Sequence, residues 1–212
     1  MILVPVKNLE NAKERLSSVL SPSERRALAE AMLQDVLEAL AAVNHHTRVG
    51  VVTSDPVATA LAQRYGFALI PDPANLGESD AIAHATKHCL ANGEDSTLVI
   101  PGDIPLIQPE DIEQVLAAAP AEGSVLVPGW DGRGSNAVLR RPADLFPLRF
   151  GNDSFPPHLR AAQATGKPCL VLQLPRIGLD VDNPADLAQL LAAEGNTRAQ
   201  QFLRRQALAA HD

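Results

Sequence analysis

Aromatic residues and cysteines are both scarce in this 212-residue chain. Phe, Tyr and Trp together make up only 3% of the sequence, so the core must be built from aliphatic side chains. An aliphatic core suits an α/β layered fold better than an aromatic-rich β-sandwich. The two cysteines, Cys89 and Cys169, are too few and too far apart for a disulfide framework or a metal knuckle. Such usage is natural in a reducing compartment, and we expect a cytoplasmic protein.

The chain also lacks an excess of basic charge and any long hydrophobic run. Its 18 Lys and Arg residues are outnumbered by 25 Asp and Glu residues, which gives a net charge of −7. A nucleic-acid binder needs a basic face to meet the phosphate backbone. No apolar run approaches the roughly 18 residues of a membrane span, and Met1 leads into an apolar strand rather than a charged, cleavable leader. We therefore expect an unprocessed chain with no nucleic-acid or membrane partner, in which a local cluster of cations holds any anionic ligand.

Common motifs for phosphate and zinc binding are missing as well. No GxxxxGK[ST] segment occurs, and the pair Gly132 and Gly134 is not continued into GxGxxG. A phosphate site in this chain must therefore be of another design. His84 and His88 are four residues apart in HATKH, but the segment lacks the Glu of a metalloprotease HExxH helix. These histidines therefore indicate an exposed helix surface rather than a metal site.

The sequence does contain short β-branched runs that alternate with longer amphipathic stretches. This pattern is typical of βαβ units around a mainly parallel sheet with helices on both faces. The first half predicts strands at 2–6, 48–53, 67–70 and 97–100, and helices at 22–43, from 56 onward, and at 79–91. Ser21 and Glu24 form a capping-box pattern around Pro22, which marks the start of the first helix. The apolar residues of this helix are predicted to form one stripe, made of Leu28, Met32, Val36, Leu40 and Val43.

The second half is less regular but continues the same architecture. It predicts helices at 109–119, 155–165, 184–193 and 196–210, and strands at 124–127, 136–140 and 169–174. With no internal repeat and no low-complexity linker, residues 1–212 are expected to form a single domain. The last helix is amphipathic, and it is a candidate contact for a homodimer.

Three cations, Lys7, Lys13 and Arg15, fall within nine residues directly after the first predicted strand. A loop at the carboxyl end of a parallel strand is where open α/β sheets bind ligands. Two of the four lysines of the chain lie in this loop. Glu10 and Glu14 interleave with the cations, so their spacing alone is equally consistent with a solvated loop.

Three aspartates are candidates for a magnesium site. Asp103 directly follows an apolar strand in PGDIPL, where Gly102 lets the backbone turn. Asp180 and Asp182 alternate on a short extended segment, so we expect their side chains on one face, where they repel each other unless a cation or proton lies between them. Mg²⁺ prefers oxygen ligands and usually takes one or two carboxylates together with substrate phosphates. Asp186 belongs to the following helix and is expected to be structural.

Taken together, these residues resemble the CofC/FbiD family of guanylyltransferases over nearly the whole chain. The resemblance is carried by VPVKNLENAKERLSSVLSPSERRALAEAML, PGDIPL, GSNAVLRRPADLFPLRFGNDSFPPH and GLDVDNPADL. It implies a Rossmann-like nucleotidyltransferase fold and an enzyme that uses GTP with Mg²⁺. Members of the family transfer GMP to the phosphate of a small acid in coenzyme F420 biosynthesis, with release of pyrophosphate. They differ in that acid, which is 2-phospho-L-lactate, phosphoenolpyruvate or 3-phospho-D-glycerate.

The resemblance also implies roles for individual residues. The cations that would contact the triphosphate are Lys7, Lys13 and Arg15. The carboxylates that would hold the metal are Asp103, Asp180 and Asp182. The residues that would line the acid and its phosphate are Ser135, Gly151 and Ser154.

The chain departs from the family pattern near the expected guanine site. Where a GLN-type segment is expected, it reads LGESD at 76–80, overlapping a loop at 71–79 whose many turn residues make it a candidate ligand segment. The candidates for nucleotide binding there are Gly77, Ser79 and Asp80. Ser135 stands where Thr is common, which keeps the hydroxyl.

The alternating strands and helices are also compatible with two other kinds of protein, another nucleotidyltransferase and a flavodoxin-like receiver. The nearest alternative is another nucleotidyltransferase of the same fold, acting on a sugar phosphate or on molybdopterin. A molybdopterin guanylyltransferase is expected to carry a GGxSxRMG-like loop, whereas residues 7–16 contain no glycine. A flavodoxin-like receiver needs an acidic pair after its first strand, and here the first strand ends in Lys7.

Overall fold

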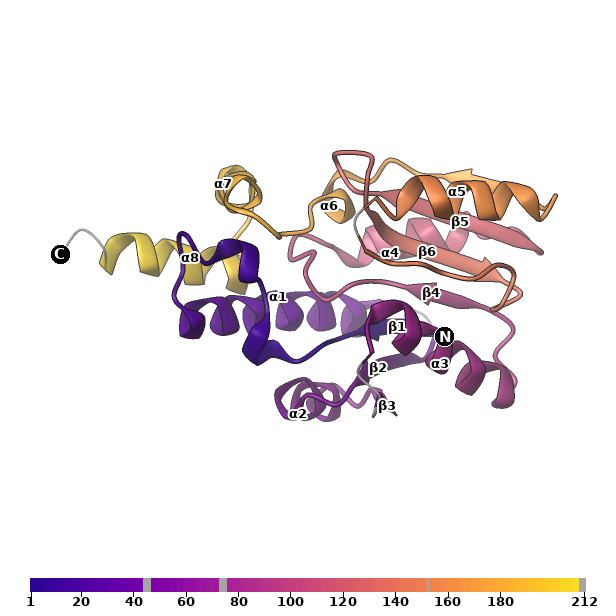
Figure 1. Ribbon diagram of the computed structural model, residues 1–212, viewed down its shortest axis with the longest axis horizontal. Coiled ribbons are helices and arrows are strands. Elements are labelled where there is room, and N and C mark those ends of the chain that lie inside the picture. Colours follow the sequence, from indigo (N-terminus) through magenta and orange to yellow (C-terminus); the bar gives the residue numbers. More distant parts are fainter. Residues whose placement is uncertain (44–46, 73–75, 152, 210–212) are drawn as a thin grey trace.

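The computed structural model describes residues 1–43, 47–72, 76–151 and 153–209, and it contains a seven-stranded sheet (Figure 1). The strand order is β3-β2-β1-β4-β6-β5-β7. The strands are β1 (Ile2–Pro5), β2 (Val49–Thr53), β3 (Ala68–Pro71), β4 (Thr97–Val99), β5 (Gly123–Pro128), β6 (Ser135–Arg141) and β7 (Cys169–Val171). Neighbouring strands run parallel except at β6, which is antiparallel to β4 and β5. The mainly parallel α/β fold predicted from the sequence is confirmed.

Helices form a layer on each face of the sheet. One layer contains α1 (Pro22–Ala42), α2 (Pro56–Arg64), α4 (Pro109–Ala117), α7 (Pro184–Ala192) and α8 (Arg198–Ala209), and the other contains α3 (Glu78–Ala91) and α5 (Phe155–Ala164). In β1, Ile2 and Val4 pack into the first layer and Leu3 into the second, because successive side chains of a strand point to opposite faces. None of the helices in the described part of the chain is long and apolar enough to cross a membrane.

Helix α1 begins where the sequence predicts. The Ser21 hydroxyl accepts a hydrogen bond from the Glu24 N–H, and the Glu24 carboxylate accepts one from the Ser21 N–H. Pro22 occupies the first helical position. The predicted apolar stripe is buried at Leu28, Met32, Val36 and Leu40.

Helix α8 packs against α1 of the same chain. Its first turn is capped by Asp35 of α1, whose carboxylate accepts hydrogen bonds from the N–H groups of Arg198 and Ala199. The helix begins at 198 rather than at 196 as predicted, because this cap comes from another helix and leaves no signal in the local sequence. Ala199 and Leu203 are buried in the core that α1 shares. Part of the apolar face of α8 is therefore buried against α1 of the same chain. A homodimer formed through this helix stays a prediction.

The segment that leads to Asp180 and Asp182 differs from the prediction. β7 ends at 171 rather than at 174, because a one-turn helix, α6 (Pro175–Gly178), follows closely. Pro175 has no N–H for a strand ladder and is favoured in the first turn of a helix. The two aspartates consequently lie in a loop after α6 and not on a strand.

The segments with the predicted site residues meet at one edge of the sheet. The carboxyl ends of β1 and β4 are neighbours there, because these two strands are parallel. β6 runs in the opposite direction, so its amino end at Ser135 reaches the same edge. This edge is where open α/β sheets bind their ligands.

Candidate active site

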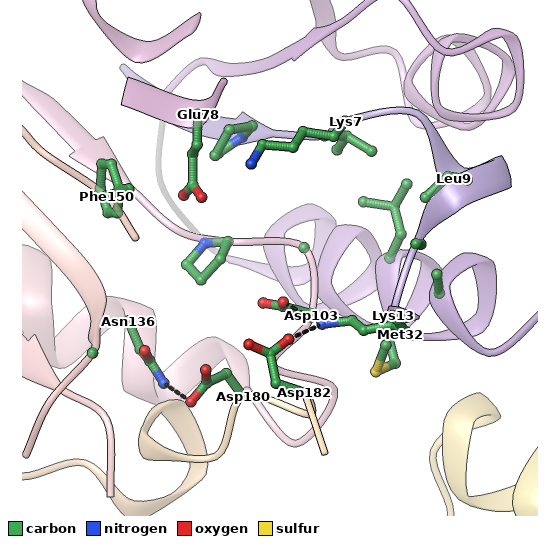
Figure 2. A pocket seen from close by; sticks show the side chains of 18 of the residues that line it. Lys7, Leu9, Lys13, Met32, Glu78, Asp103, Asn136, Phe150, Asp180 and Asp182 are labelled. Carbon is green, nitrogen blue, oxygen red and sulfur yellow. Dashed lines mark hydrogen bonds and ion pairs between the residues drawn. The ribbon is translucent and has the colours of Figure 1, made fainter. Parts of the chain in front are cut away.

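A cavity of about 440 Å³ opens at this edge of the sheet (Figure 2). Its size is typical of small-molecule sites, which span roughly 300–1,000 Å³. The residues assigned to the triphosphate, the metal and the acid all line it: Lys7, Lys13, Arg15, Asp103, Asp180, Asp182, Ser135, Gly151 and Ser154. The fold thus brings together side chains from loops that are far apart in the sequence.

The loop after β1 carries the three cations and is anchored by its own apolar residues. Two short 3₁₀ turns shape it, Leu9–Asn11 and Glu14–Leu16. Leu9 and Leu16 are buried, and the Leu9 N–H donates a hydrogen bond of 3.0 Å to the buried carboxylate of Asp55. Because its backbone is tied to the core in this way, the loop holds its cations at the cavity and is not a loosely solvated segment.

Lys13 is the centre of the charged side of the cavity. Its backbone adopts the left-handed conformation, with φ of 57°, which is uncommon for a residue other than glycine. Its ammonium lies 2.6 Å from Asp103 Oδ2 and 2.8 Å from Asp182 Oδ1, and only 8% of the side chain is exposed. Burial by itself lowers the pKa of Lys13, but the two carboxylates outweigh burial and raise the pKa above its ordinary value. Lys13 is therefore a permanent cation.

Arg15 and Lys7 extend the positive charge away from Lys13. Arg15 is 61% exposed at the rim, with Nη1 at 3.6 Å from Asp182 Oδ2. Lys7 lies farther along the cavity, and Figure 2 shows its ammonium beside the carboxylate of Glu78. All three cations of the loop after β1 thus line one cavity.

Backbone hydrogen bonds position Asp103 and Asp182. The Val181 N–H donates to the carbonyl oxygen of Asp103 at 3.1 Å, which ties the loop after α6 to the end of β4. The carboxylate of Asp186 accepts hydrogen bonds from the N–H groups of Asp182 and Asn183. Asp186 therefore has the structural role that the sequence indicated, as part of the cap of α7.

Asp180 is held by a side chain that the sequence analysis did not single out. Asn136 Nδ2, at the start of β6, donates to Asp180 Oδ1 at 3.1 Å and to the carbonyl oxygen of Ile177 at 2.9 Å. Burial, followed by repulsion from Asp103, raises the pKa of Asp180 to about 6. The pKa of Asp182 is instead lowered, because Lys13 outweighs the effect of its burial. Lys13 therefore neutralises the negative charge of this site only in part.

The aspartates suit a magnesium ion by their chemistry rather than by their present grouping. In the described part of the chain, no three His, Cys, Asp or Glu side chains are grouped so as to hold a metal by themselves. Carboxylate oxygens are nevertheless the ligands that Mg²⁺ prefers, and the ion commonly completes its shell with water and substrate phosphates. Asp103, Asp180 and Asp182 all line the cavity, and the Lys13 ammonium pairs with only two of these three carboxylates. The residues present therefore fit a magnesium ion that binds together with a phosphorylated substrate.

Two hydroxyl groups and a glycine line another part of the cavity. The Ser135 N–H donates to Ser154 Oγ at 2.9 Å, which joins the start of β6 to the start of α5. Both serines are buried. Gly151 has φ of 136°, a conformation that a residue with a side chain rarely adopts. Hydroxyl donors can bind the oxygen atoms of a phosphate or carboxylate group.

The structure does not bring Gly77, Ser79 and Asp80 to the cavity; Glu78, between them, lines it instead. Ser79 Oγ accepts a hydrogen bond from the Phe150 N–H at 2.9 Å, and Asp80 is exposed. Nucleotide binding by these three residues stays a prediction. Residues 73–75 of the candidate loop 71–79 lie outside the described part of the chain.

Glu78 is the functional candidate that sequence reasoning missed. Burial, followed by repulsion from Asp103, raises its pKa to about 7, although Lys7 and Lys13 oppose this. The available signal was the departure from the GLN-type segment, because LGESD carries a carboxyl group at its third position. Its charge therefore changes near neutral pH inside a cavity lined by cations.

The histidines of α3 lie away from this site. His84 and His88 are both exposed. They lie on a helix surface, as we expected because HATKH lacks the glutamate of an HExxH helix. Cys89, the next residue along the helix, is fully buried among apolar side chains.

The sequence model of the family described as "Guanylyl transferase CofC like" matches residues 1–211. The chain belongs to this family. The resemblance inferred from the motifs is thereby confirmed, and the protein is a CofC-like guanylyltransferase. It is 36% identical over 190 residues to the phosphoenolpyruvate guanylyltransferase of Conexibacter woesei, a match that covers 89% of this chain and 85% of that one.

Two further relatives are named for different acids. The 2-phospho-L-lactate guanylyltransferase of Methanothermobacter thermautotrophicus is 34% identical over 203 residues, covering 96% of this chain and 89% of that one. The 3-phospho-D-glycerate guanylyltransferase of Colwellia psychrerythraea is 33% identical over 192 residues, covering 90% of each chain. These CofC-like relatives thus share a reaction type and differ in the named acid.

Solved structures support the fold. A Desulfovibrio desulfuricans protein provisionally named a nucleotide-diphospho-sugar transferase aligns with a TM-score of 0.80 at 21% identity, covering 98% of this CofC-like chain and 94% of that one. A 4-diphosphocytidyl-2C-methyl-D-erythritol synthase aligns with a TM-score of 0.62 at 14% identity, covering 91% and 97%. At these identities the likeness shows that the chain has a nucleotidyltransferase fold, as predicted.

Proposed function

We propose that this CofC-like chain transfers GMP from GTP to the phosphate of a small phosphorylated acid in a Mg²⁺-dependent reaction that releases pyrophosphate. The candidate acids are 2-phospho-L-lactate, phosphoenolpyruvate and 3-phospho-D-glycerate, which are the acids named for its relatives. The observation that carries the proposal is one cavity that gathers three cations, several carboxylates and two buried hydroxyls. The resemblance to the family places such a product in coenzyme F420 biosynthesis.

The chemistry needs no general base. A phosphate oxygen of the acid attacks the α-phosphorus of GTP, the bond from that phosphorus to the bridging oxygen of the β-phosphate breaks, and pyrophosphate leaves. The attacking phosphate is largely ionised at neutral pH. Catalysis therefore consists of positioning two anions and neutralising the charge that develops between them.

The three cations supply the protein's share of that neutralisation. Lys7, Lys13 and Arg15 would bind the β- and γ-phosphates and stabilise the departing pyrophosphate. Lys13 suits this role because the carboxylates around it keep it protonated. A magnesium ion held by Asp103, Asp180 and Asp182 would supply further positive charge at the reacting phosphates.

The hydroxyl side of the cavity would hold the acid. Ser135 and Ser154 present oxygen-bound protons, and Gly151 lets the backbone of this segment come close. The three candidate acids share a phosphate and a carboxylate and differ by only a few atoms. Discrimination of that size is worth about 1–3 kcal/mol and depends on the shape of the pocket.

Pyrophosphate release tests the proposal directly. The purified chain is incubated with Mg²⁺, GTP and each acid in turn, with CTP and ATP as alternative nucleotides and a chelator as the metal control. We expect release with GTP and at least one of the acids, and loss of release when the chelator is present. No release with any of the three acids would overturn the proposal.

A further inference from the structure

His158 lies directly behind the hydroxyl side of the cavity. It is in the first turn of α5, and only 1% of it is exposed. Its Nδ1 lies 2.9 Å from Ser135 Oγ, and its Nε2 lies 2.8 Å from the backbone nitrogen of Arg149. The ring packs edge-on against Phe150, with 5.1 Å between centroids. His158 therefore contacts a residue that lines the cavity but does not line the cavity itself.

These two contacts determine which ring nitrogen carries the proton. A backbone N–H is only a donor, so the Nε2 atom that faces Arg149 must accept and holds no proton. In a neutral ring the proton is then on Nδ1, where it is donated to Ser135 Oγ. The ring is neutral because burial, followed by the positive charge of Arg140, lowers the pKa of His158 to about 4.

The direction of this hydrogen bond decides what Ser135 can do. Its Oγ accepts the proton of His158 Nδ1, so its own hydroxyl proton is left to donate to a ligand in the cavity. Ser154 is in the same situation, because its Oγ accepts from the Ser135 N–H. Two buried hydroxyls therefore offer donors to whatever oxygen atoms bind beside them.

The start of α5 offers no other donors in its first three positions. The Phe155 N–H donates to the carbonyl oxygen of Arg133 at 2.8 Å. Pro156 and Pro157 have no N–H at all. The backbone groups that often bind anions at a helix start are thus missing from these positions, which leaves the two serine hydroxyls as hydrogen-bond donors beside this helix start.

We propose that His158 is a positioning residue for the phosphorylated acid, which fixes the Ser135 hydroxyl as a hydrogen-bond donor to an anionic oxygen of that acid. The imidazole touches no substrate and takes up no proton in the reaction. The inference rests on the proposed function, because it assigns the acid to the cavity that Ser135 lines. It adds a residue that sets the affinity for the acid and leaves the affinity for GTP unchanged.

Two matched variants separate the contacts of the ring. In His158→Asn, the amide nitrogen can take the place of Nδ1, so the donor to Ser135 is kept and the acceptor for Arg149 is lost. In His158→Gln, the amide oxygen can take the place of Nε2, so the acceptor is kept and the donor is lost. Each variant removes one hydrogen bond and the same ring, and thermal melting of both checks that they fold.

The expected result is a difference between the variants in the KM for the acid. His158→Gln raises this KM roughly 3- to 10-fold, the usual worth of one hydrogen bond, while His158→Asn stays close to the wild type. The KM for GTP is unchanged in both. His84→Gln, at an exposed position of α3, serves as the control and leaves all constants unchanged. Equal KM values for the acid in the Asn and Gln variants would overturn the proposal.

Removal of the Ser135 hydroxyl gives a second test. If His158 acts through Ser135, the Asn and Gln substitutions have the same KM for the acid once Ser135→Ala is present. A difference that persists in this background would show that His158 acts by another route.

The tautomer is also measurable without activity. Nitrogen-15 NMR of the wild-type imidazoles, with the His158 signal assigned through its own backbone resonances, is expected to show the proton of His158 on Nδ1. A proton on Nε2 would overturn the proposal, and this result does not require either variant to fold. This measurement is independent of the proposed function. If the wild-type protein releases no pyrophosphate with any acid, the proposed function is wrong. If the wild-type protein is active but His158 carries its proton on Nε2, only the proposed role of His158 is wrong.

Discussion

Lys13 and Asp103 are 90 positions apart in the chain and form an ion pair of 2.6 Å inside the cavity. The same ammonium lies 2.8 Å from Asp182, so one cation links the loop after β1, the end of β4 and the loop before α7. A nucleotide that arrives here competes with two carboxylates for this ammonium. We expect Lys13 to turn toward the triphosphate when the carboxylates bind another cation.

Replacement of Lys13 tests its role in charge neutralisation. Lys13→Ala should lower kcat about 10²–10³-fold, the usual cost of removing one electrostatic group from an active site. The free energy of unfolding should fall by only about 1 kcal/mol, because both carboxylate partners are partly exposed to water. Pyrophosphate release and denaturant unfolding measure the two effects. Lys87→Ala, at an exposed position of α3, is the control, and near-normal turnover of a folded Lys13→Ala protein would contradict the assignment.

Replacement of Asp103 tests the metal site. Asp103→Asn keeps the shape of the side chain and removes its charge, so we expect turnover to fall about 10²–10³-fold and the Mg²⁺ concentration for half-maximal activity to rise. Titration of activity with Mg²⁺ measures both. Asp95→Asn, whose side chain is 79% exposed, should behave as the wild type. An unchanged Mg²⁺ requirement in Asp103→Asn would remove this residue from the metal site.

Glu78 predicts a dependence of substrate affinity on pH. Its pKa is raised to about 7, so the cavity gains a negative charge as the pH rises through neutrality and should bind anionic substrates less well. In Glu78→Gln this charge is absent, and we expect the KM values at pH 8 to be lower than those of the wild type by roughly 3- to 10-fold. KM measurements from pH 6 to pH 8 test this. A higher KM for GTP in the variant would show instead that the carboxylate binds the nucleotide.

His158 predicts a loss of stability in acid. Its pKa is lowered to about 4 in the folded chain, against about 6.5 in the unfolded chain. Below about pH 6.5 the unfolded chain binds a proton at His158 that the folded chain does not bind. The contribution of neutral His158 to the free energy of unfolding is therefore fully present above about pH 6.5 and is lost as the pH falls toward 4. The loss amounts to at most about 3 kcal/mol. Denaturant unfolding at pH 7.5 and pH 4.5 should show a smaller pH effect in His158→Asn than in the wild type, and an equal effect would contradict a buried neutral imidazole.

Much of the fold was predictable because its signals are local. The structure confirms three signals that lie within or directly before one helix: the capping box of Ser21 and Glu24, the proline at position 22, and the buried stripe from Leu28 to Leu40. The start of α8 was not predictable, since its cap comes from Asp35 of another helix. The strand that was predicted to reach 174 ends at 171, because Pro175 begins a one-turn helix.

The same distinction applies to the site. Lys7 and Asp103 could be singled out from their places after short apolar runs, and Ser135 from motifs that resemble one family. Glu78 and His158 were not singled out, since a single Glu at a helix start or a single His in a helix does not by itself indicate a role. Their only sequence signals are that Glu78 departs from the GLN-type segment and that His158 ends the segment FGNDSFPPH. What marks these two residues is burial beside particular neighbours, which depends on packing between elements.

Local sequence patterns were enough to predict the class of fold, the family and the residue types available for binding phosphates. These follow from periodicity, composition and contiguous motifs, all of which act over a few neighbouring positions. The contact of one ammonium with both Asp103 and Asp182, and the hydrogen bond between His158 and Ser135, could be found only from the packed structure. Those relationships depend on distances between segments far apart in the chain. Such distances are set by the order and direction of the strands, above all by the antiparallel β6 that brings Ser135 to the cation-bearing edge.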